Sequence, residues 1–289
     1  RVAASLDAKF IEASCQLKGS DFRTSSGKTY LKTGIETSVP ENRTAALNNG
    51  KRVLLDAIQN NGASNSPAAW YWLGRIYLQQ ADLAGADSAF TKTVKLAPEC
   101  KDETDKYRYR AWAALVNGGM QLQQAENVDS AMLLFRTASN IYQGQPLAFL
   151  NIGLLYSGQN KNDSALVYFE KAANALGPSA KDTTQIKQRN LAGFNYGVLL
   201  LNGKRYPEAI TAFERYLAWV PEDPAASKAL ATAFRAANMP DSARAIESKL
   251  IASGGNASAG GEALSPEEIF DLALQQFSDK SYADAAAAC

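Results

Sequence analysis

Few residues in this chain could carry out chemistry, and their spacing does not assemble them into a catalytic site. The 289 residues include no histidine, which excludes sites that use a histidine base and zinc sites that use a histidine ligand. The segment Ser26-Gly27-Lys28-Thr29 matches the end of a phosphate-binding loop, but Phe22 stands where that loop needs its first glycine. We therefore predict no catalytic residue, no metal site and no cofactor in this chain.

The cysteines and the adjacent carboxylates have structural interpretations. Cys15, Cys100 and Cys289 lie far apart in sequence and form no Cys-x-x-Cys pair. We interpret them as small buried or free thiols, while a disulfide between two of them stays open. The carboxylate pairs Asp102-Glu103 and Glu222-Asp223 fall in turns that we expect to be solvated, and nothing there organises them for acid–base catalysis.

The elements that position all other side chains follow from a spacing that recurs along the chain. An alanine marks each recurrence, at Ala86, Ala131, Ala165, Ala209, Ala243 and Ala285, so that successive markers are 45, 34, 44, 34 and 42 residues apart. A glycine stands twelve residues before each of the first four markers, and a phenylalanine stands four residues after it. Each unit holds two apolar stripes of helical period around a polar turn, which predicts a repeated helical hairpin.

This pattern resembles the tetratricopeptide repeat, a helix–turn–helix unit of 34 residues. One unit carries the signature of that family almost completely, at Trp70, Leu73, Gly74, Tyr77, Ala86, Phe90 and Pro98. The resemblance extends over about residues 66–289. It implies an all-α fold, in which antiparallel helical hairpins stack into a right-handed superhelical solenoid.

Composition shifts divide the chain into four segments. Residues 1–62 lack the full signature and read as a helical capping region or degenerate repeat. Residues 63–252 form a tetratricopeptide-like solenoid of about five units. Residues 253–261 are a Gly- and Ser-rich linker, and residues 262–289 begin a further unit that is truncated.

Several local features are also predicted. In the first segment we expect helices over residues 2–17, 21–37 and 41–60. The extra residues at 99–110 and 178–188 contain good helix formers, and we expect them to lengthen the first helix of the next unit. Acidic residues two positions before a marker alanine are expected to cap the second helices, namely Asp129, Asp163 and Asp241.

The resemblance also implies a binding surface, because the first helices of successive units line a concave groove in this family. Carried onto this sequence, the groove residues are Tyr71, Trp72, Arg75, Asn117, Met120, Leu150, Asn151, Leu154, Phe194, Asn195 and Val198. Three of them, Asn117, Asn151 and Asn195, occupy the same position in three consecutive units. Their amides could hold an extended peptide backbone as a ladder of hydrogen bonds, or could instead tie the helices together. An apolar groove of this kind is expected to be covered by a partner or by another part of the chain.

These observations favour a non-catalytic scaffold or adaptor for protein–protein interaction. The expected partner is a protein or peptide, and a second copy of the chain is one candidate. A net charge of +1 with scattered basic residues argues against nucleic acid, and no apolar run approaches the ~20 residues of a membrane span. The low charged content and the absence of an initiator Met suggest an exported bacterial protein, periplasmic or extracellular, that serves an envelope or extracellular assembly; a cytoplasmic protein is the alternative.

Two other functions stay open. Solenoid ends can stack head to tail, which would make the chain a self-assembling, filament-like structural protein. The repeats could also be the targeting module of an enzyme whose catalytic part lies beyond residue 289.

Overall fold

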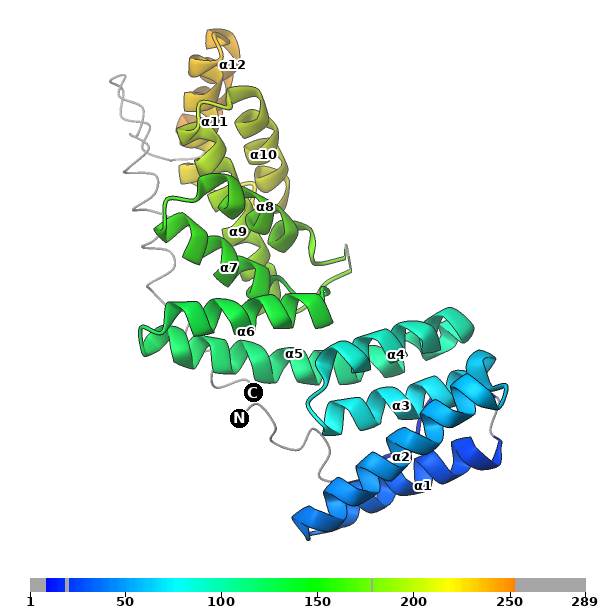
Figure 1. The fold of residues 1–289 in the computed structure, drawn as a ribbon. Coiled ribbons are helices and arrows are strands. Elements are labelled where there is room, and N and C mark those ends of the chain that lie inside the picture. The colour runs from blue at the N-terminus through cyan, green and yellow to red at the C-terminus, as the bar shows by residue number, and fades with distance from the viewer. Residues whose placement is uncertain (1–8, 19–20, 178, 253–289) are drawn as a thin grey trace. The chain divides into compact units, whose positions relative to one another are not determined.

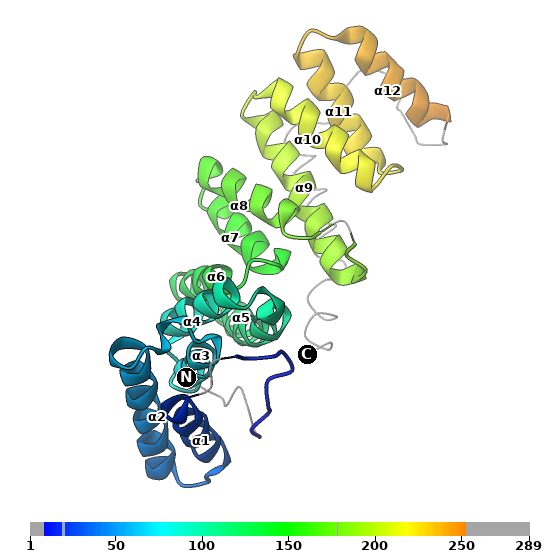
Figure 2. The same ribbon diagram turned by 90° about the vertical axis from the view of Figure 1, so that its right-hand side faces the viewer.

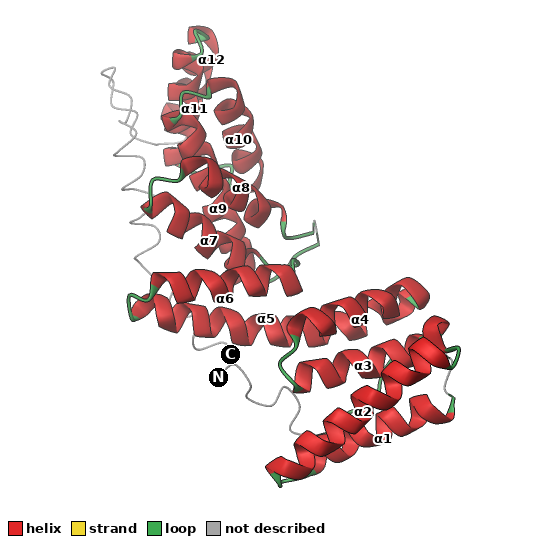
Figure 3. Ribbon diagram, in the orientation of Figure 1, coloured by secondary structure: helices red, strands yellow, loops and turns green. Residues whose placement is uncertain are grey.

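The computed structural model describes residues 9–18, 21–177 and 179–252, and within these ranges it contains twelve α-helices and no strand (Figures 1 and 3). The predicted all-α fold class of repeated helical hairpins is confirmed. The chain divides into two compact units, of which the first ends at Tyr142 and the second begins at Gln143. Each unit is described by itself.

The first unit contains three helix pairs. They are formed by α1 (Phe22–Glu36) with α2 (Pro40–Asn60), α3 (Pro67–Gln79) with α4 (Leu83–Leu96), and α5 (Lys101–Gln124) with α6 (Val128–Ile141). Short 3-10 turns precede α3, at Ala63–Asn65, and α5, at Pro98–Cys100. Each second helix lies alongside the first helix of its pair (Figure 1).

The second unit repeats this arrangement. Its pairs are α7 (Pro146–Gly158) with α8 (Asn162–Asn174), α9 (Thr183–Asn202) with α10 (Tyr206–Trp219), and α11 (Pro224–Ala236) with α12 (Pro240–Ala252). One continuous hydrophobic core runs through all three pairs and includes Leu166, Phe169, Phe194, Phe213 and Leu230.

The extra residues between repeats lengthen the helices that follow them, as the sequence predicts. Helix α5 has 24 residues and α9 has 20, whereas α3 and α7 have 13 each. The expectation of a helix over residues 2–17 is wrong for the described residues 9–17, which are not helical. The predicted linker and truncated repeat, residues 253–289, lie outside the described residues.

A glycine on the first helix and a phenylalanine on the second helix define the core of four consecutive hairpins, from α3–α4 to α9–α10. A Cβ atom added to Gly153 would lie 2.7 Å from the ring of Phe169, and the equivalent glycines face their own rings at 2.6–2.7 Å. All four rings are fully buried, at Phe90, Phe135, Phe169 and Phe213. The last hairpin, α11–α12, departs from this pattern, since Glu247 takes the place of the ring and pairs with Arg235.

The turn inside each of the five hairpins from α3–α4 to α11–α12 contains one residue in the left-handed conformation, always five residues before the marker alanine. The φ angle there is about 60°, at Ala81, Glu126, Asn160, Lys204 and Asn238. The N–H of the following residue donates back to a carbonyl five residues earlier, as from Arg205 to Leu200 at 2.9 Å. This is the Schellman ending of a helix, which usually places glycine at the left-handed position.

The position of this turn corrects the expected helix caps. Asp82 caps α4 by accepting from the Gly85 N–H at 2.9 Å, and Asn127 caps α6 in the same way. Both stand four residues before a marker alanine. The expected caps, Asp129, Asp163 and Asp241, lie two residues later, within the first helical turn. There their charge still complements the positive end of the helix dipole.

The core contact predicts a large loss of stability for Phe169→Ala. Removing a fully buried ring should lower the free energy of unfolding by roughly 3–5 kcal/mol, because it leaves a cavity against Gly153. Urea denaturation measures this difference. Val167→Ala on the same helix is the control, since Val167 is exposed and should change stability by less than about 0.5 kcal/mol. Equal effects from the two variants would contradict the packing described.

The turn geometry predicts that Lys204→Gly stabilises the protein by roughly 0.5–1 kcal/mol. Glycine adopts a positive φ without the steric cost that lysine has there. Lys204→Ala should leave stability unchanged, because alanine has the same Cβ clash. Asn160→Gly should gain less, since asparagine already tolerates this conformation. Thermal or urea denaturation of the three variants would reveal this order, and a destabilising Lys204→Gly would disprove it.

Candidate functional site

Residues 9–18, which we call the strap, form a non-helical segment that bends at Ser14 and Cys15 (Figure 2, dark blue coil). This segment contacts α3 and the start of α5 in the first unit. The ring of Phe10 stacks on Trp72 of α3 with 5.8 Å between centroids. Near the other end of the strap, the Lys18 carbonyl accepts from the Ala68 N–H at 3.4 Å. The strap thus follows α3 in the manner of a bound peptide.

A disulfide fixes the strap to the repeat. Cys15 and Cys100 are bonded across a sequence separation of 85 residues, with their Cα atoms 5.3 Å apart. Cys100 is fully buried in the short turn just before α5. The interpretation of these two cysteines as free thiols is therefore wrong, because the fold brings together what the sequence separates. Cys289 lies outside the described residues.

A buried arginine binds the strap through aromatic rings and a carbonyl group. Arg75 on α3 is only 1% exposed. Its guanidinium lies 4.7 Å from the ring centroid of Tyr107, 5.1 Å from that of Phe10 and 5.4 Å from that of Trp72. Its Nη1 also donates to the carbonyl of Ile11. Aromatic faces attract a cation strongly when it is shielded from water, so they stabilise this charge inside the unit.

A buried carboxylate completes the contacts with the strap. Glu103, at the start of α5, accepts hydrogen bonds from the hydroxyl groups of Ser14 and Tyr71, and Lys106 lies 3.4 Å away. Burial acts to raise the pKa of Glu103, but the two hydrogen bonds and the Lys106 charge outweigh it, so the pKa lies below its usual value. Burial also raises the pKa of Tyr71, which keeps its hydroxyl group a donor. The expectation that Asp102-Glu103 is solvated is therefore wrong for Glu103.

The second pair of carboxylates that we expected to be solvated, Glu222-Asp223, also contains a buried member. Asp223 is buried, and it accepts hydrogen bonds from the backbone N–H groups of Ala225 and Ala226 at the start of α11. The Tyr216 hydroxyl donates to the same carboxylate at 2.6 Å. Asp223 is therefore a helix cap, and the solvated turn expected there is wrong for this residue.

The predicted groove residues of the first unit divide into buried and exposed positions. Tyr71, Trp72 and Arg75 are buried. Trp72 and Arg75 contact the strap, and Tyr71 donates to Glu103, which binds the strap. Met120 is also buried, whereas Asn117 is exposed. The groove of this unit is therefore covered in part by another segment of the same chain.

Most of the predicted groove residues of the second unit are buried in its interior. Three are core residues that are at most 2% exposed, namely Leu150, Phe194 and Val198, and Leu154 is half-buried. Two more share the asparagine slot of Asn117 and are also buried. Asn151 donates from Nδ2 to the carbonyl four residues earlier at 2.9 Å, and Asn195 does the same. These amides bond within their own helices; whether the groove binds a partner stays a prediction.

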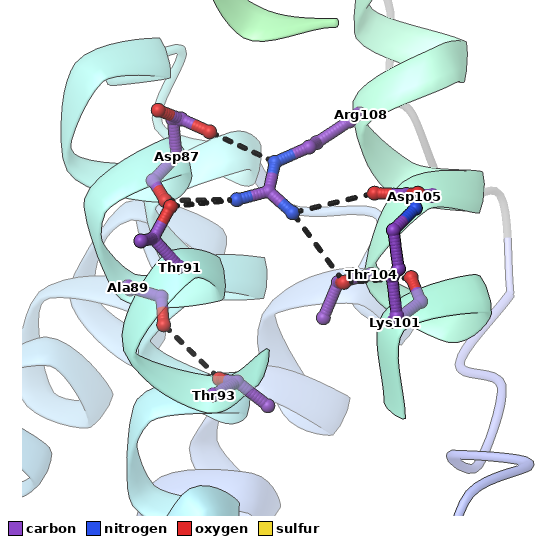
Figure 4. A network of polar contacts seen from close by, with 8 residues as sticks. All are labelled: Asp87, Ala89, Thr91, Thr93, Lys101, Thr104, Asp105 and Arg108. Carbon is purple, nitrogen blue, oxygen red and sulfur yellow. Dashed lines mark hydrogen bonds and ion pairs between the residues drawn. The ribbon is translucent and has the colours of Figure 1, made fainter. Parts of the chain in front are cut away.

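An ion-pair network joins the lengthened part of α5 to α4 (Figure 4). Arg108 donates from Nε to the Asp87 carboxylate at 2.8 Å and from Nη2 to the Thr91 hydroxyl at 2.9 Å. Its Nη1 lies 3.4 Å from both Thr104 and Asp105 on its own helix. The extra residues before the third helix pair therefore hold adjacent hairpins together.

Sequence reasoning did not predict the strap or the residues that hold it in place. The residues concerned are Phe10, Ser14, Cys15, Cys100 and Glu103. Only the two cysteines gave a usable signal, because a second cysteine makes a pairing possible. The others stand outside the repeat signature, and no spacing connects them to α3.

The geometry defines a class of protein built from stacked helical hairpins, four of which are closed by a glycine–phenylalanine contact. Sequence models of one family match the chain: one tetratricopeptide repeat model covers residues 150–224 and 197–258, and another covers residues 67–100. The chain is a tetratricopeptide repeat protein. No curated protein matches it.

Solved structures of other repeat proteins are similar at low sequence identity. The C-terminal part of a TPR repeat-containing protein from Cytophaga hutchinsonii is 18% identical over 91% of this chain and 92% of that chain, with a TM-score of 0.41. YrrB, described as a TPR protein with an unusual peptide-binding site, is 16% identical over 69% and 91%, with a TM-score of 0.36. PilW, a type IV pilus biogenesis factor, is 16% identical over 88% and 99%, with a TM-score of 0.38.

The disulfide predicts that the strap is a stabilising element. Replacing Cys15 by serine should lower the free energy of unfolding by roughly 4–5 kcal/mol, since it removes the constraint on a loop of 85 residues. Urea denaturation with and without a thiol reductant measures this. The reductant should bring the native protein to the stability of Cys15→Ser and leave the variant unchanged. A native protein that is insensitive to reductant would show that the bond is absent.

Proposed function

We propose that this chain is a non-catalytic scaffold that binds a protein partner as an accessory subunit of an extracytoplasmic bacterial assembly. The family supports the broad role, because tetratricopeptide repeats are modules of protein–protein interaction and are generally non-catalytic. The observation that carries the specific proposal is the strap, a non-helical segment that α3 and α5 of the first unit hold by ring, carbonyl and hydroxyl contacts.

The proposed partner surface is the outer side of the strap together with the remaining open part of the groove. Ile11 on the strap is 48% exposed, although its carbonyl is bound to Arg75. Asn117 on α5 is exposed, and its amide can donate to and accept from a peptide backbone. A partner segment that packs on Ile11 would lie on the strap, on the side that faces away from α3.

The disulfide supports the extracytoplasmic placement. Stable disulfides form in oxidising compartments such as the bacterial periplasm or the cell exterior, and they are rare in the cytosol. The Cys15–Cys100 bond joins a buried turn to the strap, so it belongs to the folded structure. Among the helices that the structure describes, none is long and apolar enough to cross a membrane.

Site-specific photo-crosslinking in the source cells tests the partner surface. A photoreactive amino acid at Ile11 or Asn117 should crosslink a protein of defined mass, while the same group at Leu133 should not, because Leu133 is exposed on the second helix of its hairpin. Crosslinks from Leu133 alone would place the interface on the second helices and reject the proposal. Crosslinks to further copies of the chain would favour the self-assembling alternative.

Thiol trapping tests the compartment separately. Cells are quenched with acid and alkylated before lysis, and the peptides that contain Cys15 and Cys100 are then examined without reduction. We expect the disulfide-linked pair. Alkylated, unpaired cysteines in the native protein would contradict the extracytoplasmic placement and favour the cytoplasmic one.

A further inference from the structure

We propose that the second unit carries a binding site for a carboxylate of a protein partner, formed by Arg189, Arg215 and Trp219. The three side chains come from the lengthened start of α9 and from the end of α10. The site lies in a different unit from the strap and involves none of the predicted groove residues. It is therefore a second surface, independent of the partner surface proposed above.

The two arginines gather around one indole ring. The guanidinium carbon of Arg189 lies 4.4 Å from the ring centroid of Trp219, and that of Arg215 lies 5.4 Å from it. Arg215 also lies 5.9 Å from the ring centroid of Tyr196. All four side chains are half-buried. Two positive charges are thus held close to one aromatic ring and partly removed from water.

Neither arginine has a counter-ion among the residues that the structure describes. Nε and Nη2 of Arg189 both donate to the side-chain oxygen of Asn190, the next residue, at 3.1 and 2.8 Å. Arg215 donates to the amide oxygen of Asn174 on α8 at 3.3 Å, and its buried Nη2 has no hydrogen-bond partner in the described chain. Burial alone lowers the pKa of Arg189. The aromatic contacts and the helix ends nearby supply only part of the missing negative charge.

Arg108 in the first unit is an example of an arginine whose charge and N–H groups are paired within the fold. It also lies in a lengthened first helix, yet it reaches the carboxylates of Asp87 and Asp105 and two threonine hydroxyl groups. Arg189 and Arg215 together reach two asparagine oxygens. The remaining N–H groups on the half-exposed parts of the two guanidinium groups can donate to an oxyanion from outside, whereas the buried Nη2 of Arg215 is not accessible to it.

The backbone leaves room for this arrangement. Gly193 stands where other units have a large residue, and a Cβ atom there would come within 2.9 Å of the Trp219 ring. The glycine thus lets the indole lie against α9 between the two arginines' helices. A planar carboxylate fits a guanidinium in a bidentate manner, and an apolar residue beside it could pack on the exposed part of the indole. An acidic side chain or a chain terminus could supply the carboxylate.

Peptide titration of the full chain, followed by NMR, tests the site. The probes are three short apolar peptides acetylated at the N-terminus: one with a central glutamate and an amidated end, one with glutamine and an amidated end, and one with glutamine and a free carboxyl end. We expect saturable shifts of the Trp219 indole N–H and of the Nε–H signals of both arginines with a carboxylate peptide. The neutral peptide should cause none. The first and third peptides separate a side-chain carboxylate from a chain terminus.

Matched variants decide the role of each arginine. Arg189→Gln and Arg215→Gln should each raise the Kd of the carboxylate peptide about tenfold, the size of one charge-assisted hydrogen bond. Arg205→Gln should not, although it removes the same charge from an exposed position on the second unit. Arg189→Lys keeps the charge but loses the planar fork, so it should also weaken binding, and it serves as the test if a glutamine variant fails to fold.

Three results would overturn the proposal. One is the absence of shifts up to roughly 10 mM carboxylate peptide, which would leave the arginines a packing role. Another is equal weakening by Arg205→Gln, which would show a general charge effect. The third is tighter binding of inorganic phosphate than of either carboxylate peptide, which would reassign the ligand. Crosslinking at Ile11 and Asn117 does not report on this site, so the two proposals can fail separately.

Discussion

The packing of one phenylalanine ring against one glycine is the contact on which the four hairpins from α3–α4 to α9–α10 depend. With no Cβ on Gly153, the ring of Phe169 lies directly on the backbone of α7. The fifteen residues between them must then include the end of one helix, a turn and the start of the next, which leaves room only for a tight Schellman turn. The burial of an aromatic ring contributes several kcal/mol, more than the strain of a left-handed Lys204 or Glu126.

The repeat therefore builds the scaffold, and residues outside the repeat make the units different. The lengthened start of α5 supplies Glu103, which binds the strap, and Arg108, which holds α4. The lengthened start of α9 supplies Arg189, which contacts Trp219 and no acidic group in the described chain. The longer α5 thus adds contacts within the first unit, whereas the longer α9 adds an arginine to the second unit that has no acidic partner in the described chain.

The features that the sequence could predict are those encoded by local spacing. The hairpins, the glycine–phenylalanine pairs and the longer α5 and α9 all follow from residues within one unit or next to it. The disulfide could not be predicted in the same way, because Cys15 and Cys100 are 85 residues apart and neither belongs to the repeat. Burial of Glu103 was missed because its sequence neighbours are polar, while its partner Ser14 comes from the strap. Burial of Asp223 was missed because the repeat signature does not show that its carboxylate meets the Tyr216 hydroxyl and the start of α11.

The strap also limits how a partner can use the first unit. A competing peptide would have to replace the Phe10 ring on Trp72, the carbonyl on Arg75 and the hydroxyl on Glu103, because an unpaired buried charge is costly. The disulfide makes the strap an intramolecular competitor, whose effective concentration far exceeds that of a free partner. For the partner surface proposed above, packing on the outer side of the strap is therefore expected to be more favourable than displacing it, and the strap would then form part of that surface.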